Sequence, residues 1–523
     1  MILLAMRSIG CRIIPAIIAA STGTTAVANE PTVAVTTAAA EIQQPFALSI
    51  DALRASVSDA NHALAARRLE TEISRIQARG ERGVLEPSFV ASVERRRTER
   101  QNSIEQSLSQ TAGQFNEDAD SISGGVEGTL QWGTQYWVGT SLDKRTNNLT
   151  SLAVPQPFTS EYLTFSGIRI TQPLLKGAGM DAVMARARVA EVEVRVKEQE
   201  LRKETMELIS RAELSYWQLT LFQHLLELRE DSVAIAEKVL QDNRERVSAG
   251  KMSENEILEA EVGLAQRQSQ RVEARQSMLA AADLLRAFLS ELPDSEGMAS
   301  LRATDEPVLR MLKSSFSESM GAAIRWHPDY LAQREIIEQE RVRVRYMERQ
   351  RWPQLDLVGS YGVNGIGDST TNSYEMGRDA DYEAWSIGVE LRIPLGGGIR
   401  EKADLKTAVR RKEQALLELK TAEVEIANAL HTALKRVNST RQQAGYYQRM
   451  VDSNRRLLES EIGLLDAGKS DSRRVLQIEQ ELVDAEIAYY QSLVEHQRAW
   501  LDWEVAEGSL LEHRDMEPTF ASR

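Results

Sequence analysis

The chain has 523 residues and a formal net charge of −14, which is enough length for about three ordinary domains or for one elongated domain. It contains no run of eighteen or more apolar residues, so the sequence predicts no transmembrane helix. Basic side chains that neutralise phosphates supply most of the affinity for nucleic acids, so the acidic composition argues against a nucleic acid partner.

Residues 1–28 have the features of a secretory signal peptide. Arg7 and Arg12 precede an apolar stretch at 13–20, and the small residues Ala-Val-Ala at 26–28 form a cleavage site. Met6 is an alternative start, and a buried first helix is the structural alternative to a signal. We interpret the segment as a signal for export across the inner membrane of a bacterium.

The only cysteine, Cys11, lies within this signal. The exported protein would therefore have no thiol, no disulfide and no cysteine-based metal site. Residues 29–46 are small, polar and aperiodic, and we expect them to form a flexible tail.

The first half contains a region of predicted strands over about 87–171. Residues 87–93 (PSFVASV) and 162–170 have strand composition and bound this region. Between them, residues 124–146 have the pattern of an additional hairpin that turns at 132–134, and the second half has no equivalent of it.

Residues 182–248 and 400–466 have the pattern of very long helices. They contain no proline and hardly any glycine, and apolar residues recur at alternating steps of three and four, which indicates coiled-coil packing. At 1.5 Å per residue each helix would be about 100 Å long. Further helical stretches follow at about 253–290 and 471–510, so each long helix is expected to begin a helical hairpin.

The second half repeats the predicted strands. Residues 385–393 alternate apolar with polar side chains, residues 355–363 form a similar strand, and the polar segment 364–384 between them is expected to be a long exposed loop. Strands of about ten residues with one apolar and one polar face fit a transmembrane β-barrel. The alternative is the edge of a soluble β-sandwich.

Two kinds of segment occur twice at matching places: the corners where a strand leads into a long helix, and the tips where a helical hairpin turns. This matching indicates an internal duplication. We expect a first repeat over 47–290, with its helical hairpin at 182–290, and an insertion over 291–320. A second repeat would span 321–511, with strands at about 353–394 and a hairpin at 400–510, before a tail at 512–523. The strand-to-helix corners are at Pro173, Gly177, Pro394 and Gly398, and the hairpin tips are at Ala249, Gly250, Lys251, Met252, Ala467, Gly468, Lys469 and Ser470.

The second tip lies in the stretch GLLDAGKS (463–470), which matches the phosphate-binding pattern G-x-x-x-x-G-K-[ST]. Such a loop needs a buried strand before it, whereas the preceding residues are charged and helical in pattern. The matched first tip lacks both the first glycine and the serine. We therefore interpret Gly468 as the glycine cap of a helix and expect no nucleotide or other cofactor.

With strands, corners, long helices and tips all present twice, the chain resembles the TolC-like outer-membrane efflux family. The resemblance covers about residues 48–511, and its most specific stretches are QPLLKGAG (172–179), RVSAGKMSENEILEAE (246–261) and DAGKSDSRRVLQIE (466–479). It implies an α+β membrane protein that forms a homotrimer. Each chain would give four strands to a shared outer-membrane β-barrel and its helices to a periplasmic α-helical barrel. In that frame, the hairpin at 124–146 either widens the barrel or folds into it.

The resemblance also implies a function and partners. The protein would be the passive outer-membrane exit duct of a tripartite efflux or secretion system, opened at its periplasmic helical tip. A periplasmic adaptor protein would dock on the tips, and an inner-membrane pump of the RND or ABC type would supply the energy. Drugs, metal ions and secreted polypeptides all leave through ducts of this kind, so the cargo stays open.

Four residues occupy gate positions by this resemblance. Glu256 and Glu259 lie just past the first tip, and Arg474 and Gln477 stand where the family has constricting acidic residues. We hypothesise that Arg474 pairs with Glu256 or Glu259 of a neighbouring hairpin and latches the tip shut. The alternative is that all four are solvated helix charges or polar groups.

Two rival functions follow from the sequence. A periplasmic coiled-coil tether without channel activity would explain the heptads, but not the alternating strands or the repeated corners. An exported enzyme is disfavoured, because the six histidines are scattered and neither H-E-x-x-H nor G-x-S-x-G occurs. No catalytic or metal-binding residues are therefore predicted.

Overall fold

The computed structural model describes residues 46–104, 107, 114–148, 160–250, 252–289, 301–467 and 469–516. The expected signal peptide, nearly all of the expected tail and two tip residues, Lys251 and Gly468, lie outside these residues. All described elements belong to one compact unit, residues 45–523.

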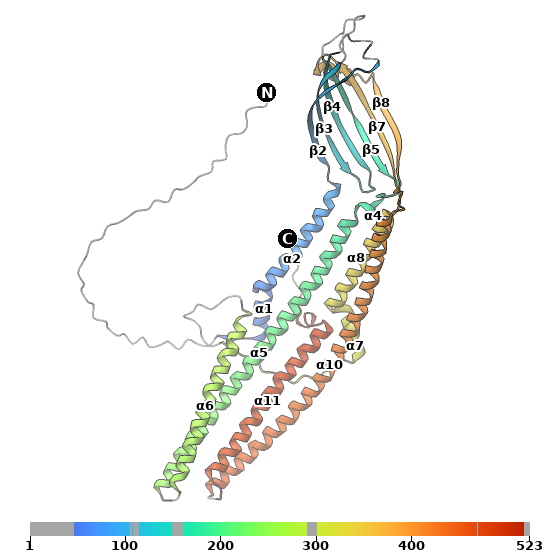
Figure 1. Ribbon diagram of the computed structural model, residues 1–523. Coiled ribbons are helices and arrows are strands. Elements are labelled where there is room, and N and C mark those ends of the chain that lie inside the picture. Colours follow the sequence, from blue (N-terminus) through green and yellow to red (C-terminus); the bar gives the residue numbers. More distant parts are fainter. Residues whose placement is uncertain are drawn as a thin grey trace, which may run out of the picture. The chain divides into compact units, whose positions relative to one another are not determined.

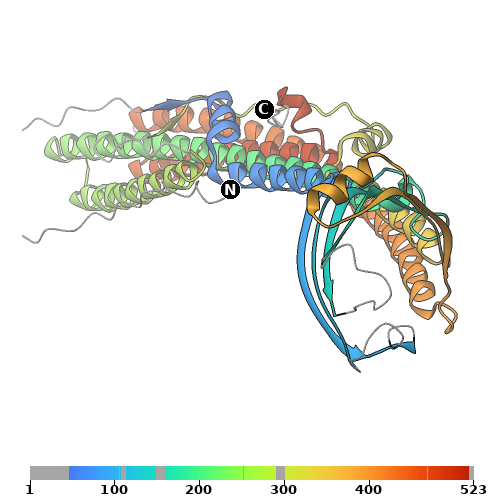
Figure 2. The same ribbon diagram turned by 90° about the horizontal axis from the view of Figure 1, so that it is seen from above.

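Six strands form one antiparallel sheet within the described residues (Figure 1). Their order across the sheet follows the order along the chain, and the sheet is curved (Figure 2). The strands are β2 (Ser88–Gln101), β3 (Gln114–Thr129), β4 (Gln135–Asn147), β5 (Glu161–Pro173), β7 (Gln354–Gly367) and β8 (Glu383–Arg392).

The number of strands corrects one expectation. The resemblance implied four strands per chain, but the segment around 124–146 forms β3 and β4 and joins the sheet between β2 and β5. The expected loop at 364–384 also contains a helix, α9 (Thr370–Arg378), which packs against β7 and β5. Gly365 permits this packing, because a Cβ there would lie 1.8 Å from the carbonyl oxygen of Ser373.

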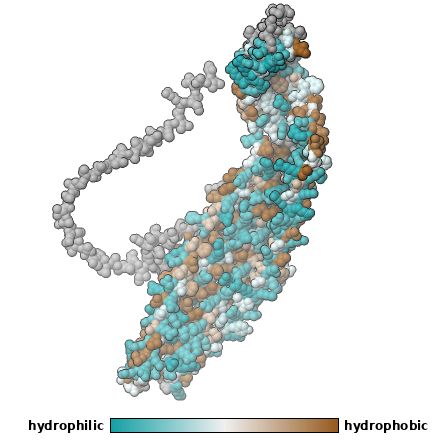
Figure 3. All heavy atoms as spheres, viewed as in Figure 1, coloured by the Kyte–Doolittle hydropathy of each residue, from teal (hydrophilic) through white to brown (hydrophobic). Residues whose placement is uncertain are grey.

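The two faces of the sheet differ in polarity because successive side chains of a strand point to opposite faces. One row of directly paired residues is apolar on every strand: Phe89, Val126, Val138, Ile168, Tyr361 and Trp385. The adjacent row on the other face is mostly polar: Ser88, Glu127, Trp137, Arg169, Ser360 and Ser386. Apolar side chains are visible along the β8 edge of the sheet (Figure 3).

Long helices extend from the sheet and form two hairpins (Figure 1). Helix α5 (Ala185–Ser248) packs against α6 (Glu254–Arg286), and α10 (Ile399–Asp466) packs against α11 (Ser472–Glu507). Near the sheet, α2 (His62–Glu81) lies along α5, and α8 (Pro328–Gln350) contacts both α5 and α10. None of the helices in the described residues is long and apolar enough to cross a membrane.

A core in the middle of the helical region joins the segments around residues 48 and 305 to α5. Tyr216 of α5 is fully buried, and its hydroxyl contacts the backbone oxygen of Leu48 at 3.0 Å and Asp305 Oδ2 at 2.7 Å. There a two-residue strand, β1 (Ala47–Leu48), pairs in parallel with β6 (Arg302–Ala303). Helix α1 (Ile50–Ala60) packs into this core, whereas α7 (Phe316–Trp326) packs against α10 and α11 in a separate core.

Candidate functional site

The candidate site is the pair of helical tips farthest from the sheet (Figure 1). At the first tip, α5 ends where Ala249 donates a hydrogen bond to the backbone oxygen of Glu245, and Gly250 has a left-handed φ of 71°. Ser253 then caps α6 by accepting a hydrogen bond from the Asn255 backbone N–H. These local bonds reverse the chain between two antiparallel helices.

The second tip uses equivalent chemistry. The backbone N–H of Lys469 donates a hydrogen bond to the backbone oxygen of Leu464 at 2.8 Å. This is the 6→1 hydrogen bond that ends a helix in a Schellman motif. Asp471 caps α11 by accepting from the backbone N–H of Arg474 at 2.7 Å. Gly463 lies inside α10, so a helix rather than a strand precedes the GLLDAGKS stretch. The prediction that this stretch is a helix end is confirmed, although Gly468 itself lies outside the described residues.

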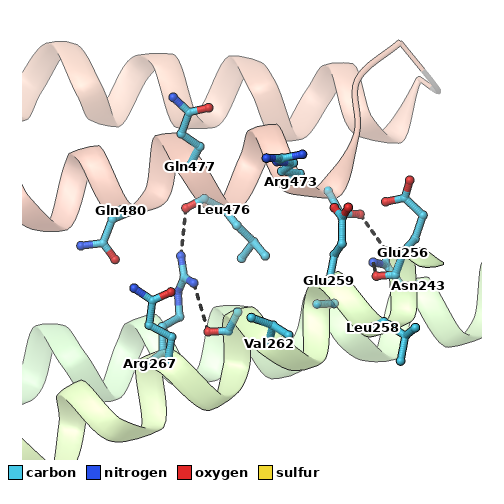
Figure 4. Close-up of a pocket in the computed structure, with 14 residues that line it drawn as sticks. Asn243, Glu256, Leu258, Glu259, Val262, Arg267, Arg473, Leu476, Gln477 and Gln480 are labelled. Atoms are coloured by element: carbon cyan, nitrogen blue, oxygen red, sulfur yellow. Dashed lines mark hydrogen bonds between the residues drawn. The ribbon is translucent and has the colours of Figure 1, made fainter. Parts of the chain in front are cut away.

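A groove of about 580 Å³ separates the two hairpins next to these tips (Figure 4). It is bounded by α6 on one side and α11 on the other, with Asn243 of α5 at one end. Leu258 and Val262 of α6 contribute exposed apolar surface to its lining, and Leu476 contributes from α11.

A buried ion pair crosses between the hairpins along this groove. The guanidinium of Arg267 on α6 lies 2.5 Å from Glu479 Oε2 on α11, and the two side chains are 6% and 1% exposed. Arg267 also donates to the backbone oxygen of Leu476 at 2.9 Å and to the Ser232 hydroxyl at 3.2 Å. One arginine therefore connects α5, α6 and α11.

A second buried link lies closer to the tips. The Ser472 hydroxyl of α11 donates to Asn243 Oδ1 at 2.7 Å, and Asn243 Nδ2 donates to the backbone oxygen of Glu256 at 3.1 Å. Asn243 is 1% exposed and Ser472 is 3% exposed. The first and second hairpins are therefore joined by buried polar contacts at two levels along the groove. Nearby, Arg246 Nη1 of α5 also donates to the backbone oxygen of Leu465 on α10 at 3.5 Å.

The structure places the four predicted gate residues unequally. Glu256, Glu259 and Gln477 all line the groove, and Glu256 is half-buried there. Arg474 is exposed and donates to Gln477 Oε1 at 3.2 Å on its own helix. Arg473 lines the groove instead. The latch between Arg474 and a glutamate of a neighbouring chain stays a prediction.

Sequence reasoning missed Arg267, Glu479, Asn243 and Ser472. A signal for Arg267 was present, because it stands in heptad register with Ala260, Ala274 and Ala281, which are all buried. A charged residue on such a seam predicts a buried partner. The partner could not be named from the sequence, since it lies 212 residues further along the chain.

Both strand-to-helix corners adopt the glycine conformations that a sharp turn requires. Gly177 has a φ of 81° and Gly398 a φ of 68°, values that L side chains rarely adopt. Pro173 ends β5, and Pro394 follows β8. The corners are also linked to each other, because Lys176 Nζ lies 3.4 Å from Glu401 Oε1.

The family of the chain follows from a comparison with family models. Residues 138–291 and 321–503, which make up more than half of the chain, match the outer membrane efflux protein family. The chain belongs to this family. Membership places this efflux family protein in the outer membrane, the location predicted from its sequence.

Curated relatives of this efflux family protein are distant. It is 23% identical to the alkaline protease secretion protein AprF of Pseudomonas aeruginosa, over 59% of this chain and 61% of the relative. It is 22% identical to the outer membrane efflux protein BepC of Brucella suis, over 62% of this chain and 68% of the relative. The aligned region thus spans less than two thirds of the first of these relatives.

Solved structures support the fold of this efflux family protein. It is similar to the Campylobacter jejuni CmeC outer membrane channel, with a TM-score of 0.62 and 15% identity over 90% of this chain and 86% of the other. It is also similar to the outer-membrane channel OprN, with a TM-score of 0.63 and 15% identity over 88% of this chain and 89% of the other. The predicted TolC-like fold is therefore confirmed. Among the residues that the structure describes, no group of three or more His, Cys, Asp or Glu side chains could hold a metal ion.

Proposed function

We propose that three copies of this chain form a passive exit duct through the outer membrane. The observation that carries the proposal is a sheet with one apolar face and one polar face, at one end of the long helical hairpins. Its apolar row is largely exposed in the single chain, with Phe89 75% and Trp385 72% exposed. A band of this kind suits lipid, while the opposite polar row suits a water-filled lumen. A periplasmic tether would have no use for an exposed apolar band.

The edges of the sheet provide the reason for assembly. In the described sheet, β2 and β8 each pair with one neighbour only. Within lipid every backbone N–H and C=O group needs a hydrogen-bond partner, so these edges must be paired by further copies. Because β2 and β8 run in opposite directions, the β8 edge of one copy continues the antiparallel alternation with β2 of the next.

The mechanism we propose is mechanical rather than catalytic. The buried links from Arg267 to Glu479 and from Ser472 to Asn243 hold the hairpins of each chain together. Opening the periplasmic end then requires either that these links break or that both hairpins of a chain move as one body. Glu256, Glu259, Arg474 and Gln477 would line the moving gate, and the two tips at 249–252 and 467–470 would dock the periplasmic adaptor.

The partners and the cargo belong to the same proposal. An inner-membrane pump, of the RND or ABC type, would deliver cargo through the adaptor. Two curated relatives are named for protease secretion and one for efflux. We therefore propose that the cargo is a secreted polypeptide or a small molecule, with the choice made by the pump.

Separation of inner and outer membranes on a density gradient, after a high-salt wash, tests the location of the protein. It is the first step in testing whether the protein is a duct. Recovery in the dense outer-membrane fraction is expected. The purified protein should then have the mass of three chains, and it should form conducting channels in planar bilayers. Recovery in the soluble periplasm would exclude the barrel and favour the tether. Recovery in the outer membrane without any bilayer conductance would exclude the duct.

A further inference from the structure

We propose that the hairpin β3–β4 is part of the barrel wall, so that three chains close a barrel of eighteen strands instead of twelve. This inference rests on the proposed trimeric duct. The other four strands, β2, β5, β7 and β8, are the ones that the two halves of the chain share. The hairpin would therefore be an insertion that widens the outer-membrane part of the duct.

Continuous pairing is the first observation that places the hairpin in the wall. β3 pairs with β2 from Ser88↔Glu127 to Gln101↔Gln114, over the full length of β2. β4 pairs with β5 from Gln135↔Thr171 to Arg145↔Glu161. A hairpin folded into a lumen would leave β2 and β5 to pair with each other, whereas here the hairpin separates them completely.

Matching faces are the second observation. Val126 of β3 and Val138 of β4 lie in the same apolar row as Phe89 and Ile168 on the flanking strands. Their sequence neighbours on the other face are two glycines, Gly125 and Gly139, and the directly paired Glu127 and Trp137. The inserted strands thus carry the alternation of a membrane wall, in register with the shared strands.

The third observation is a row of glycines that lets the inserted and the shared strands curve in the same way. Four glycines follow one another in a single row of the polar face, between Val90 on β2 and Ala384 on β8: Gly125, Gly139, Gly167 and Gly362. Aromatic rings cover these glycines, because Cβ atoms at Gly125 and Gly139 would meet Trp137, and Cβ atoms at Gly167 and Gly362 would meet Phe165. Glycines beneath aromatic rings allow a sheet to bend sharply. The inserted and the shared strands therefore bend by the same means.

The apolar band also has the slope that a barrel requires. Its centre lies at Val389 on β8, which is in the same pairing row as Gln172 of β5. On β2 its centre lies at Ala91, which is in the same row as Ser166 of β5. The band thus shifts by about 20 Å along the strands over about 24 Å across the sheet, a tilt of about 40°. Barrel strands tilt by this amount against the bilayer.

The consequence is a wider channel. At this tilt and the normal strand spacing, twelve strands give a backbone diameter of about 24 Å, whereas eighteen give about 36 Å. Side chains about 5 Å deep would leave lumen radii of about 7 Å and about 13 Å. The wall would then admit a much broader cargo, such as a compactly folded polypeptide segment, and the periplasmic tips would be the narrowest point of the duct.

Fluorescent labels on neighbouring residues test whether the hairpin is wall. Since the only cysteine is within the expected signal peptide, Val126→Cys and Glu127→Cys can each be labelled with bimane and reconstituted in vesicles. We expect brominated lipid to quench the label at Val126 and aqueous iodide to quench the label at Glu127. Quenching of both by iodide alone would place the hairpin in the lumen and overturn the inference. Phe89→Cys on β2 is the reference, because a label there that lipid fails to quench would instead contradict the proposed membrane sheet.

Removal of the hairpin tests the width. Deletion of residues 114–147 leaves four strands per chain that still alternate in direction. With polyethylene glycol added on the side of the barrel loops, polymers of about 10 Å radius should reduce the conductance of the intact protein and leave the shortened one unaffected. An identical polymer cut-off for both would overturn the inference. If the shortened protein does not assemble, electron cryomicroscopy of the intact trimer decides, since a wall of twelve strands would contradict the proposal.

Discussion

At the scale of single residues, the ion pair of Arg267 and Glu479 is a buried charged contact between the two halves of the chain near the tips. Both side chains are almost completely buried, and Glu479 Oε1 has no hydrogen-bond partner among the described residues. Such a pair adds little net stability compared with apolar packing, but removal of one partner leaves an uncompensated buried charge. Replacing only one of the two residues is therefore expected to destabilise the contact between the hairpins.

We predict that Arg267→Met loosens the tips. The unpaired Glu479 carboxylate should cost about 3–5 kcal/mol of local stability, measured as faster amide hydrogen exchange in α11. Arg271→Met on the same helix is the matched control, because Arg271 is exposed, and it should have little effect. The double change of Arg267→Met with Glu479→Leu should restore slow exchange. If the single and double changes exchange equally fast, the charge is not the cause.

A buried histidine predicts how stability depends on pH. His496 is fully buried, its ring contacts the Thr440 hydroxyl at 3.1 Å and the backbone N–H of Arg310 at 3.2 Å, and burial lowers its pKa. The unfolded chain, with a histidine pKa of about 6.5, then binds a proton more readily than the folded chain. The contribution of His496 is present above about pH 6.5 and is lost as the pH falls toward its lowered pKa.

His496→Gln should therefore lose less stability than the unchanged protein between pH 7.5 and pH 5.5, by up to about 1.4 kcal/mol. Thermal unfolding at the two pH values measures the difference. His431→Gln serves as the control, because His431 is exposed on α10. A parallel decline of all three proteins would mean that other groups set the acid sensitivity.

At the scale of elements, α9 depends on a close backbone contact with β7. A Cβ at Gly365 would lie 1.8 Å from Ser373 O, so Gly365→Ala should displace α9 and cost about 1–3 kcal/mol. Gly359→Ala on the same strand is the control, since its Cβ would lie 3.7 Å from the nearest atom, an ordinary contact. Thermal unfolding of both variants measures the difference, and equal midpoints would contradict the contact.

Elements whose signal is periodic could be predicted from the sequence. The spacing of apolar residues predicted helices over 182–248 and 400–466, and the structure has α5 and α10 there. Alternation predicted the strands around 162–170 and 385–393, and a hairpin around 124–146. The sequence could not assign that hairpin to the sheet, because pairing with β2 and β5 depends on contacts that alternation alone does not specify.

Other parts lacked any local signal. Helix α9 was missed because its nine residues, TTNSYEMGR, are polar and too few to show a period. The partner of Arg267 was missed for a different reason. In the second repeat, the position equivalent to Arg267 is occupied by Ala485. The ion pair between the hairpins is therefore not duplicated, and the repeat symmetry could not reveal it.

At the scale of the whole molecule, the orientation of the sheet decides between duct and tether. Ile387 of β8 is 71% exposed in the single chain and belongs to the apolar face, whereas its neighbour Ser386 faces the other way and lies 2.7 Å from the Ser360 hydroxyl. If the apolar face meets lipid, a charge at Ile387 must be held in the bilayer, while a charge at Ser386 enters water.

We therefore predict that Ile387→Arg costs about 2–4 kcal/mol per chain and removes the protein from the outer membrane, while Ser386→Arg costs little. The measurement is the amount of assembled protein in the outer-membrane fraction for the two variants, each expressed at the same level. Three copies carry each change, so even a modest cost per chain should separate the two strongly. Equal assembly of both variants would mean that this face does not contact lipid. In that case both the apolar band and the width inferred from its slope would need another explanation.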